Sequence, residues 1–243
     1  MNSFFNIAMN IGQNIEVLKN GETISSILSI NNIDALKELA LGLDITFETT
    51  PPIADGNMLL SLEDKLFAYV FNNISLSDED RIKISAIFFP IGLKVVSTKN
   101  RVIETNEVLD FGTSQDLVIH NYDTLTMETG ASMKIANTPL ILLAQTLVIK
   151  TGNVPLKNYD LGILGITGNT PPKKPKAANG CEGEKGSDGG NGLPSLFTRV
   201  VIGPGGINSI TNQFVIYSHS GDGGDGGNGG DGTNLLSGAN GGD

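Results

Sequence analysis

Glycine recurs at every third position in three blocks of this chain, and this spacing limits what the chain can fold into. The first block begins at Gly162, the second runs from Gly180 to Gly192, and the third begins at Gly221. A period of three fits neither an α-helix nor a β-strand, but it is the period of the polyproline-II helix. Because glycine has no Cβ, an edge made of glycine lets another backbone approach closely. We therefore expect these blocks to serve architecture rather than chemistry.

Three arrangements of the glycine blocks are open. The first is a packed layer of polyproline-II segments that bond to one another through their backbones. The second is a collagen triple helix, which is disfavoured because the five triplets that start at Gly180 hold a single proline. The third is a solvated linker and tail, since Gly, Asp, Asn and Ser bury little surface to offset the entropy of ordering.

Composition excludes several classes of protein. The 243 residues carry a formal net charge of −10, which makes a nucleic-acid partner unfavourable. Cys181 is the single cysteine, so no intrachain disulfide forms. The N-terminus lacks the features of a Sec signal peptide, and no apolar run is long enough to span a membrane. Localisation is left open by these features; a protein that acts outside the cell would need another export route or release by lysis.

Residues 1–91 are predicted to form a small α/β region. Asn31 and Asn32 are both candidate caps for a helix with an apolar face from Ile33 to Leu43, and short strands are expected at 14–18 and 44–49. Ser61 with Asp64, and Ser77 with Asp80, form capping-box patterns ahead of two further helices. The apolar faces expected for these two helices are Leu62, Leu66, Tyr69 and Val70 for one, and Ile82, Ala86 and Phe89 for the other.

Residues 92–220 are predicted to form a β body. Short β-branched runs occur at 93–96, 102–104, 108–111, 117–119, 125–127, 133–135, 140–143 and 147–149. The segment 117–127 aligns with 140–149 at an offset of 22 to 23 residues; Val95 precedes Leu117 by 22, and 214–216 resembles a further copy. A repeat near this length is typical of the coils of a β-solenoid, while evenly spaced short strands also suit a β-sandwich.

The fold class expected from these patterns is mainly β: a short β-solenoid-like body with glycine-rich polyproline-II segments, preceded by the α/β region. A β-sandwich with a disordered glycine-rich tail is the alternative. Residues 151–194 read as a Gly/Pro-rich insertion into the body, and strands at 196–202 and 213–217 are expected to flank a turn at 203–206. Residues 221–243 read as a repeat segment that looks truncated.

A calcium site is one hypothesis for the last glycine block. Residues 226–234 match the Gly-Gly-x-Gly-x-Asp spacing of the parallel β-roll, in which carboxylates of successive repeats hold calcium. Asp222, Asp225 and Asp231 are the candidate ligands, and no other cofactor is expected. A single copy of the motif does not make a complete site, so solvated aspartates are the plainer interpretation.

Catalysis finds little support in the sequence. His120 and His219 are the two histidines, and the string His219-Ser220-Gly221-Asp222 is too local to assemble a triad from separated segments. Acidic neighbours oppose thiolate formation at Cys181. Asp110 paired with Asp116 or Asp123 would suit a polysaccharide-cleaving groove only if the carboxylates face each other. We expect a protein that is not an enzyme.

The fragments Thr-Leu-Thr-Met at 124–127 and Thr-Leu-Val-Ile at 146–149, together with the Gly-x-x blocks, carry a family resemblance. Residues 92–243 resemble glycine-rich β-solenoid and polyglycine-II surface proteins of bacteria and phage, with phage tail-tip adhesins the nearest comparison. The resemblance implies a binding or structural module, adhesin-like or part of a toxin, whose partner is a cell-surface glycan or protein receptor. A homo-oligomer or an assembly partner is a further expectation. The alternatives are a glycan-active β-helix enzyme and a calcium-responsive secreted repeat protein.

Overall fold

The computed structural model describes most of the chain in two compact units. The described residues are 3–45, 61–72, 74–112, 114, 116–150, 159–175, 184–193, 196–209 and 214–228. The first unit, here called the body, comprises Met1–Gly162 and Phe197–Tyr217, and the second, here called the bundle, comprises Ile163–Leu196 and Ser218–Asp243.

Capping residues determine where three helices of the body begin, as the sequence predicts. Helix α3 (Ile33–Gly42) starts at Asn32, whose side chain accepts a hydrogen bond from the Ala35 amide at 2.9 Å. Helix α4 (Leu62–Asn72) starts at a capping box in which Ser61 and Asp64 exchange side-chain and backbone hydrogen bonds of 3.1 Å. Satisfying amides that have no partner in the first helical turn favours a start at these positions.

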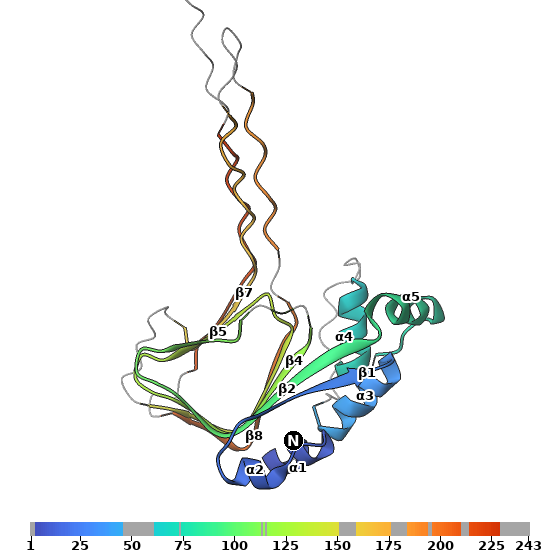
Figure 1. Ribbon diagram of the computed structural model, residues 1–243, viewed down its shortest axis with the longest axis vertical. Helices are drawn as coiled ribbons and strands as arrows, with labels where there is room; N and C mark the ends of the chain where they lie inside the picture. The colour runs from blue at the N-terminus through green and yellow to red at the C-terminus, as the bar shows by residue number, and fades with distance from the viewer. Residues whose placement is uncertain are drawn as a thin grey trace, which may run out of the picture. The chain divides into compact units, whose positions relative to one another are not determined.

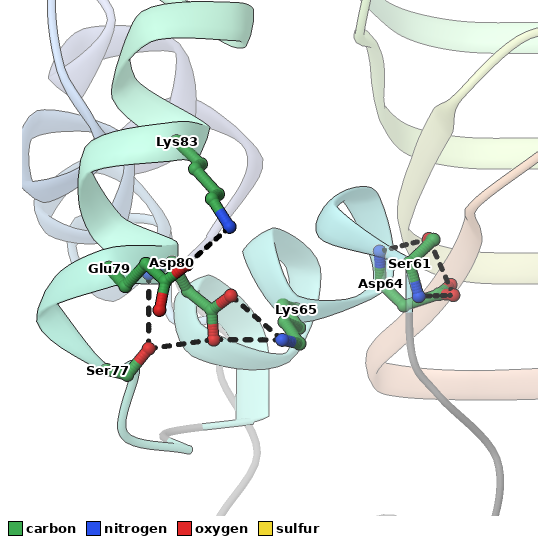
Figure 2. Close-up of polar contacts among 7 residues, drawn as sticks. All are labelled: Ser61, Asp64, Lys65, Ser77, Glu79, Asp80 and Lys83. Carbon is green, nitrogen blue, oxygen red and sulfur yellow. Dashed lines mark hydrogen bonds and ion pairs between the residues drawn. The ribbon is translucent and has the colours of Figure 1, made fainter.

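Helix α5 (Asp78–Phe88) begins in the same way at Ser77, and Figure 2 shows how its cap connects to α4. The Ser77 hydroxyl accepts from the Asp80 amide at 3.1 Å and donates to Asp80 Oδ2 at 2.9 Å. The same carboxylate accepts two hydrogen bonds from Lys65 Nζ, at 2.8 and 2.9 Å. The hydrogen bond from Lys65, followed by that from Ser77, lowers the pKa of Asp80 below its usual value. The cap of α5 therefore also holds α4 and α5 together.

The apolar face expected for α5 is wrong at two of its three residues, while Phe89 packs against the core as expected. The helix buries Ile84, whereas Ile82 is 69% exposed and Ala86 is exposed as well. The pattern of this helix is weakly amphipathic, so the neighbouring elements decide which residue faces the core.

The N-terminal residues fold differently from the prediction. Residues expected as a strand at 14–18 form helix α2 (Ile15–Lys19), capped by Asn14, which accepts from the Glu16 amide at 3.0 Å. Helix α1 (Phe4–Asn10) precedes it, and strand β1 (Ile24–Ile30) follows it. The strand expected at 44–49 lies largely outside the described residues. The Asn14 cap outweighs the β propensity of Ile15 and Val17.

Two sheets make up the rest of the fold. The five-stranded sheet has the order β1-β2-β4-β6-β8, and the four-stranded sheet has the order β3-β5-β7-β9. The remaining strands are β2 (Ile91–Ile103), β3 (Val108–Asp110), β4 (Val118–Met127), β5 (Ser132–Ala136), β6 (Leu140–Ile149), β7 (Leu161–Leu164), β8 (Thr198–Ser209) and β9 (Ile216–His219). β1 pairs antiparallel with β2, and the other pairs of the larger sheet are parallel. The larger sheet is therefore mixed.

The strand register tests the repeat seen in the sequence. Val118 pairs with Leu140 and Thr124 with Thr146, so the offset of 22 residues is confirmed as a strand register, whereas the offset of 23 that aligns Leu117 with Leu140 is wrong by one residue. Val95 pairs with Ile119, so the offset expected for this strand is wrong by two residues. The next strand beside β6 is β8, where Leu140 pairs with Thr198, and the proposed copy at 214–216 is wrong. Gly203–Gly206 is not a turn between strands but a register shift inside β8.

One apolar core of the body is shared by the helices and the five-stranded sheet, whose arrangement is drawn in Figure 1. Alternate residues of the strands point into this core, since side chains alternate across a strand. They include Leu93, Val95, Leu117, Ile119, Ile141 and Leu143, all at most 2% exposed. They pack against Leu36 of α3 and against Val70 and Phe71 of α4. Burial of this apolar surface is the main stabilising contribution.

The predicted fold class is therefore wrong. The protein has an α/β fold with five helices, a mixed five-stranded sheet and a parallel four-stranded sheet among the described residues, and no solenoid is evident in them. The physical reason is that the repeated apolar positions pack against helices and not only on neighbouring coils. The prediction placed the helices in a separate α/β region ahead of a mainly β body, whereas they share one core with the five-stranded sheet.

Candidate binding surfaces

The bundle contains three extended segments that run side by side: 165–175, 184–193 and 219–228, here called the first, second and third segments (Figure 1). Backbone hydrogen bonds join them at steps of three residues or multiples of three. The first segment donates to the third, the third to the second, and the second to the first. The bonds are Gly165 to His219, Gly168 to Asp222, Lys174 to Asn228, Gly221 to Leu193, Gly224 to Gly190, Gly227 to Ser187, Leu193 to Ile166 and Gly190 to Asn169, all between 2.7 and 3.0 Å.

These bonds close a ring around the axis of the bundle. Residue numbers rise together along the first and third segments, which are therefore parallel, and fall along the second, which is antiparallel to both. Each segment uses one amide and one carbonyl per repeat for its two neighbours. These contacts agree with the packed alternative of the sequence analysis and disagree with a solvated linker at these residues.

Glycine is required where the segments meet. A Cβ added at Gly224 would collide with the backbone of Gly168 and Asn169, and one at Gly189 would collide with the backbone of Gly224 and Asp225. The same holds, with a backbone atom closer than 3.0 Å, at Gly165, Gly168, Gly186, Gly192 and Gly221. Real Cβ atoms do not approach neighbours this closely, so the period-three glycines are explained by backbone contact.

Not every glycine of the third segment has this role. A Cβ at Gly223 would find its nearest neighbour at 3.9 Å, and one at Gly226 at 3.8 Å, which are ordinary contacts. The bundle itself therefore does not need glycine at these two positions.

Two of the three aspartates predicted to bind calcium, Asp222 and Asp225, lie exposed on the third segment. Asp222 Oδ1 is 3.9 Å from Nε2 of His219, and the Asp225 amide donates to Thr170 Oγ1 at 3.1 Å. Asp231 lies outside the described residues. Within the described part of the chain, no group of three or more His, Cys, Asp or Glu side chains is placed to hold a metal ion. Calcium at these aspartates stays a prediction.

The other histidine lies in the body and is largely buried. Nδ1 of His120 is 3.0 Å from the Tyr122 hydroxyl, and the ring of Phe111 meets the imidazole edge-on at 4.8 Å between centroids. Burial, with a smaller contribution from the charge of Lys94, lowers the pKa of His120 to about 4. Burial raises the pKa of Tyr122 to about 12. The pair is therefore neutral at ordinary pH, with its polar atoms joined to each other.

The remaining residues considered for catalysis have separate surroundings. Asp110 accepts from Lys134 Nζ at 2.9 Å and from the Gly112 amide at 2.8 Å. Burial acts to raise the pKa of Asp110, but these two hydrogen bonds outweigh it and the pKa is lowered. The Asp116 amide donates to Ser114 Oγ at 3.1 Å. Cys181 lies outside the described residues.

A surface that the sequence analysis missed lies on the four-stranded sheet. The ring of Tyr159 is nearly parallel to that of Tyr217, with an interplanar angle of 7° and 5.8 Å between centroids. Burial raises the pKa of Tyr159, and the charges of Lys134 and Asp110 lie close enough to affect it. Asp110, Lys134, Tyr159 and Tyr217 are here called the tyrosine strip.

Comparison with known proteins adds no assignment. No protein-family model, no curated protein and no solved structure matches this chain. Among the described residues, no helix is both long and apolar enough to cross a membrane. The bundle and the tyrosine strip are therefore the features of the molecule that bear on its function.

Proposed function

We propose that this protein is a non-enzymatic binding and structural module of a bacterial or phage surface or secreted assembly, adhesin-like or a component of a toxin. The observation that carries the proposal is the ring of backbone hydrogen bonds that joins the three segments of the bundle. Such a ring keeps extended chain ordered without a side-chain core. Its partner is a molecule of the cell surface.

The length of the bundle and the exposure of its side chains support this proposal. Polyproline-II geometry advances about 3.1 Å per residue, so a segment of ten residues extends roughly 30 Å. Glycine fills the inner positions, and the residues between the glycines are largely exposed, as at Asp222, Asp225 and Asn228. A long thin element of this kind supports reach and surface contact. Reaction chemistry instead favours a concave site that excludes water.

The competing hypothesis is a glycan-active enzyme. Glycoside hydrolysis uses two carboxyl groups that flank the scissile bond. Asp110, one of the carboxylates considered for that role, is paired with Lys134, which lowers its pKa and so disfavours its use as a general acid at neutral pH. The lowered pKa leaves Asp110 suited only to the ionised role in such a pair, so the enzyme hypothesis requires a second carboxyl group that faces it and acts as the acid.

Binding without turnover tests the proposal. The full chain, labelled with a fluorophore, is added over a range of concentrations to intact Gram-negative cells, Gram-positive cells and cultured animal cells. We expect saturable retention on at least one of them, with no release of reducing sugar into the supernatant. Labelled protein that has been heat-denatured serves as the control for nonspecific adsorption.

Two outcomes contradict the proposal. Release of reducing ends in proportion to protein and time indicates an enzyme, and linear, unsaturable adsorption to every cell type indicates that no surface receptor is recognised.

A further inference from the structure

The tyrosine strip combines an exposed aromatic ring with an exposed ion pair, and its members come from four different strands or their edges. We infer that it binds a pyranose ring of a cell-surface glycan, with Tyr217 as the contact platform. The inference rests on the proposed function and deepens it, because it names the class of partner and the residues that meet it.

The two rings have different exposure, which gives them different roles. Tyr217 is 45% exposed, whereas Tyr159 is 6% exposed and lies nearly parallel beside it. Tyr159 therefore supports the platform, and Tyr217 offers a face to a ligand. The face of an aromatic ring carries partial negative charge, which suits the weakly positive C–H groups on one face of a pyranose. Tyrosine also supplies this contact at a low cost in conformational entropy.

The support under the platform depends on the backbone. A Cβ at Gly162 would collide with the ring of Tyr159, at atoms that include the hydroxyl oxygen at 2.9 Å. Glycine at 162 therefore lets the Tyr159 ring lie over the β7 strand. Close beside it, the Asp160 carboxylate accepts from the Val215 amide at 2.7 Å, which fixes the start of β9 and hence the place of Tyr217.

The polar half of the strip suits the hydroxyl groups of a sugar. Each hydroxyl both donates and accepts a hydrogen bond, and the Asp110–Lys134 pair offers an acceptor and a donor 2.9 Å apart. The side chains of Asp110 and Lys134 are 45% and 36% exposed, so both are accessible. Met133 and Ile135, the neighbours of Lys134 on β5, are buried, which directs Lys134 away from the core.

The combination favours a glycan over a protein receptor. The strand order β3-β5-β7-β9 places Lys134 two strands and Asp110 three strands from Tyr217, so the strip matches an oligosaccharide: one sugar stacks on Tyr217 and hydroxyl groups of a neighbouring sugar meet the charged pair. A protein partner instead requires about 800 Å² of complementary surface on each side.

An array of immobilised pyranose oligosaccharides, including hexoses, N-acetylhexosamines and sialic acid, tests the inference with the full chain. We expect wild type to bind a defined subset, and Tyr217→Ala to bind it about tenfold or more weakly, as expected for loss of a stacked aromatic contact. Tyr217→Phe keeps the ring and should stay within about threefold of wild type. The matched control is Ile216→Ala, an exposed neighbour on β9, which should leave binding unchanged.

A second variant guards against misfolding of Tyr217→Ala, and melting temperatures are compared for all variants. Lys134→Met leaves the aromatic pair in place and should weaken binding about threefold, because a donor to the sugar is lost.

The outcomes separate this inference from the proposed function. Equal glycan binding by wild type, Tyr217→Ala and Lys134→Met overturns the tyrosine strip as the site but leaves a binding module. Saturable binding to cells that survives periodate oxidation of their glycans indicates a protein receptor, which also overturns the inference alone. The absence of saturable binding to both the array and the cells overturns both.

Discussion

The body is stabilised mainly by its side chains, whereas the bundle is stabilised by its backbone. In the body, side chains such as Leu93 and Leu143 are fully buried between helices and a sheet. In the bundle, the inner positions are glycine, and the contacts are made by amides and carbonyls of neighbouring segments. One unit excludes water with apolar surface, and the other joins backbone polar groups that would otherwise bond to water.

The difference determines which substitutions each unit tolerates. A core leucine exchanged for methionine keeps its volume and usually costs less than about 1.5 kcal/mol. An inner glycine of the bundle has no such substitute, since even alanine adds a Cβ where the next backbone lies. The bundle is ordered because glycine leaves room for backbone hydrogen bonds. Its structure is therefore specified by where glycine occurs in the sequence, and not by hydrophobic residues.

Among the substitutions considered, Gly224→Ala is expected to have the largest effect, and it tests whether the bundle depends on close backbone contact. The added Cβ overlaps the backbone of Gly168 and Asn169, so we expect the bundle to lose its backbone hydrogen bonds while the body stays folded. Hydrogen exchange of the amides of Gly165, Leu193 and Gly221 measures this directly, because each amide donates within the bundle. Gly223→Ala is the matched control and should keep wild-type protection. Equal protection in both alanine variants would show that close backbone approach does not hold the bundle together.

Acid should weaken the body by a smaller amount. His120 is neutral in the folded state with a pKa of about 4, while its ordinary value is 6.5, so below pH 6.5 the unfolded chain binds the proton more readily. The free energy of unfolding therefore falls as the pH drops from 6.5 towards 4, by about 3 kcal/mol at 1.36 kcal/mol per pH unit. Urea denaturation at a series of pH values measures the slope of the free energy of unfolding against pH.

The slope between pH 6.5 and 4.5 should be reduced in His120→Gln. It should persist in His219→Gln, which changes the exposed histidine of the other unit. A slope that His120→Gln leaves intact would show that the buried imidazole is not its source.

The smallest effect on stability is expected at the start of helix α5. Ser77→Ala removes the acceptor for the Asp80 amide at the start of α5, and we expect the free energy of unfolding of the body to fall by about 1 kcal/mol. Ser75→Ala, at an exposed position two residues earlier, should change it by less than about 0.5 kcal/mol. If both variants have the same midpoint in urea, the cap contributes nothing to stability.

Local signals in the sequence predicted the helices with clear caps. Asn32, Ser61 and Ser77 each bond to backbone amides within three residues, so the information needed to place α3, α4 and α5 is contiguous. The burial of Ile84 instead of Ile82 was missed, because it depends on what α5 packs against. Strand β1 was missed as well, since its pairing with β2 joins residues far apart in the chain.

The tyrosine strip shows the same limit at the level of a site. Tyr159 and Tyr217 are separated in the sequence by the whole of the first and second glycine blocks, and no sequence pattern links the two residues. Pairing of strands in the four-stranded sheet brings them together. The aspartates at 222 and 225 were found because they recur with a short period, which a sequence displays directly.

The period-three glycine edge and the starts of three helices were readable from the sequence, because backbone sterics and capping act over a few residues, but the sequence left open whether the glycine edges pack together. The tertiary structure decided that the repeated strands pack against helices, that β8 rather than 214–216 follows β6, and that two distant tyrosines share a surface. Burial and strand pairing depend on what lies across the core, and that neighbour is not encoded in the spacing of nearby residues.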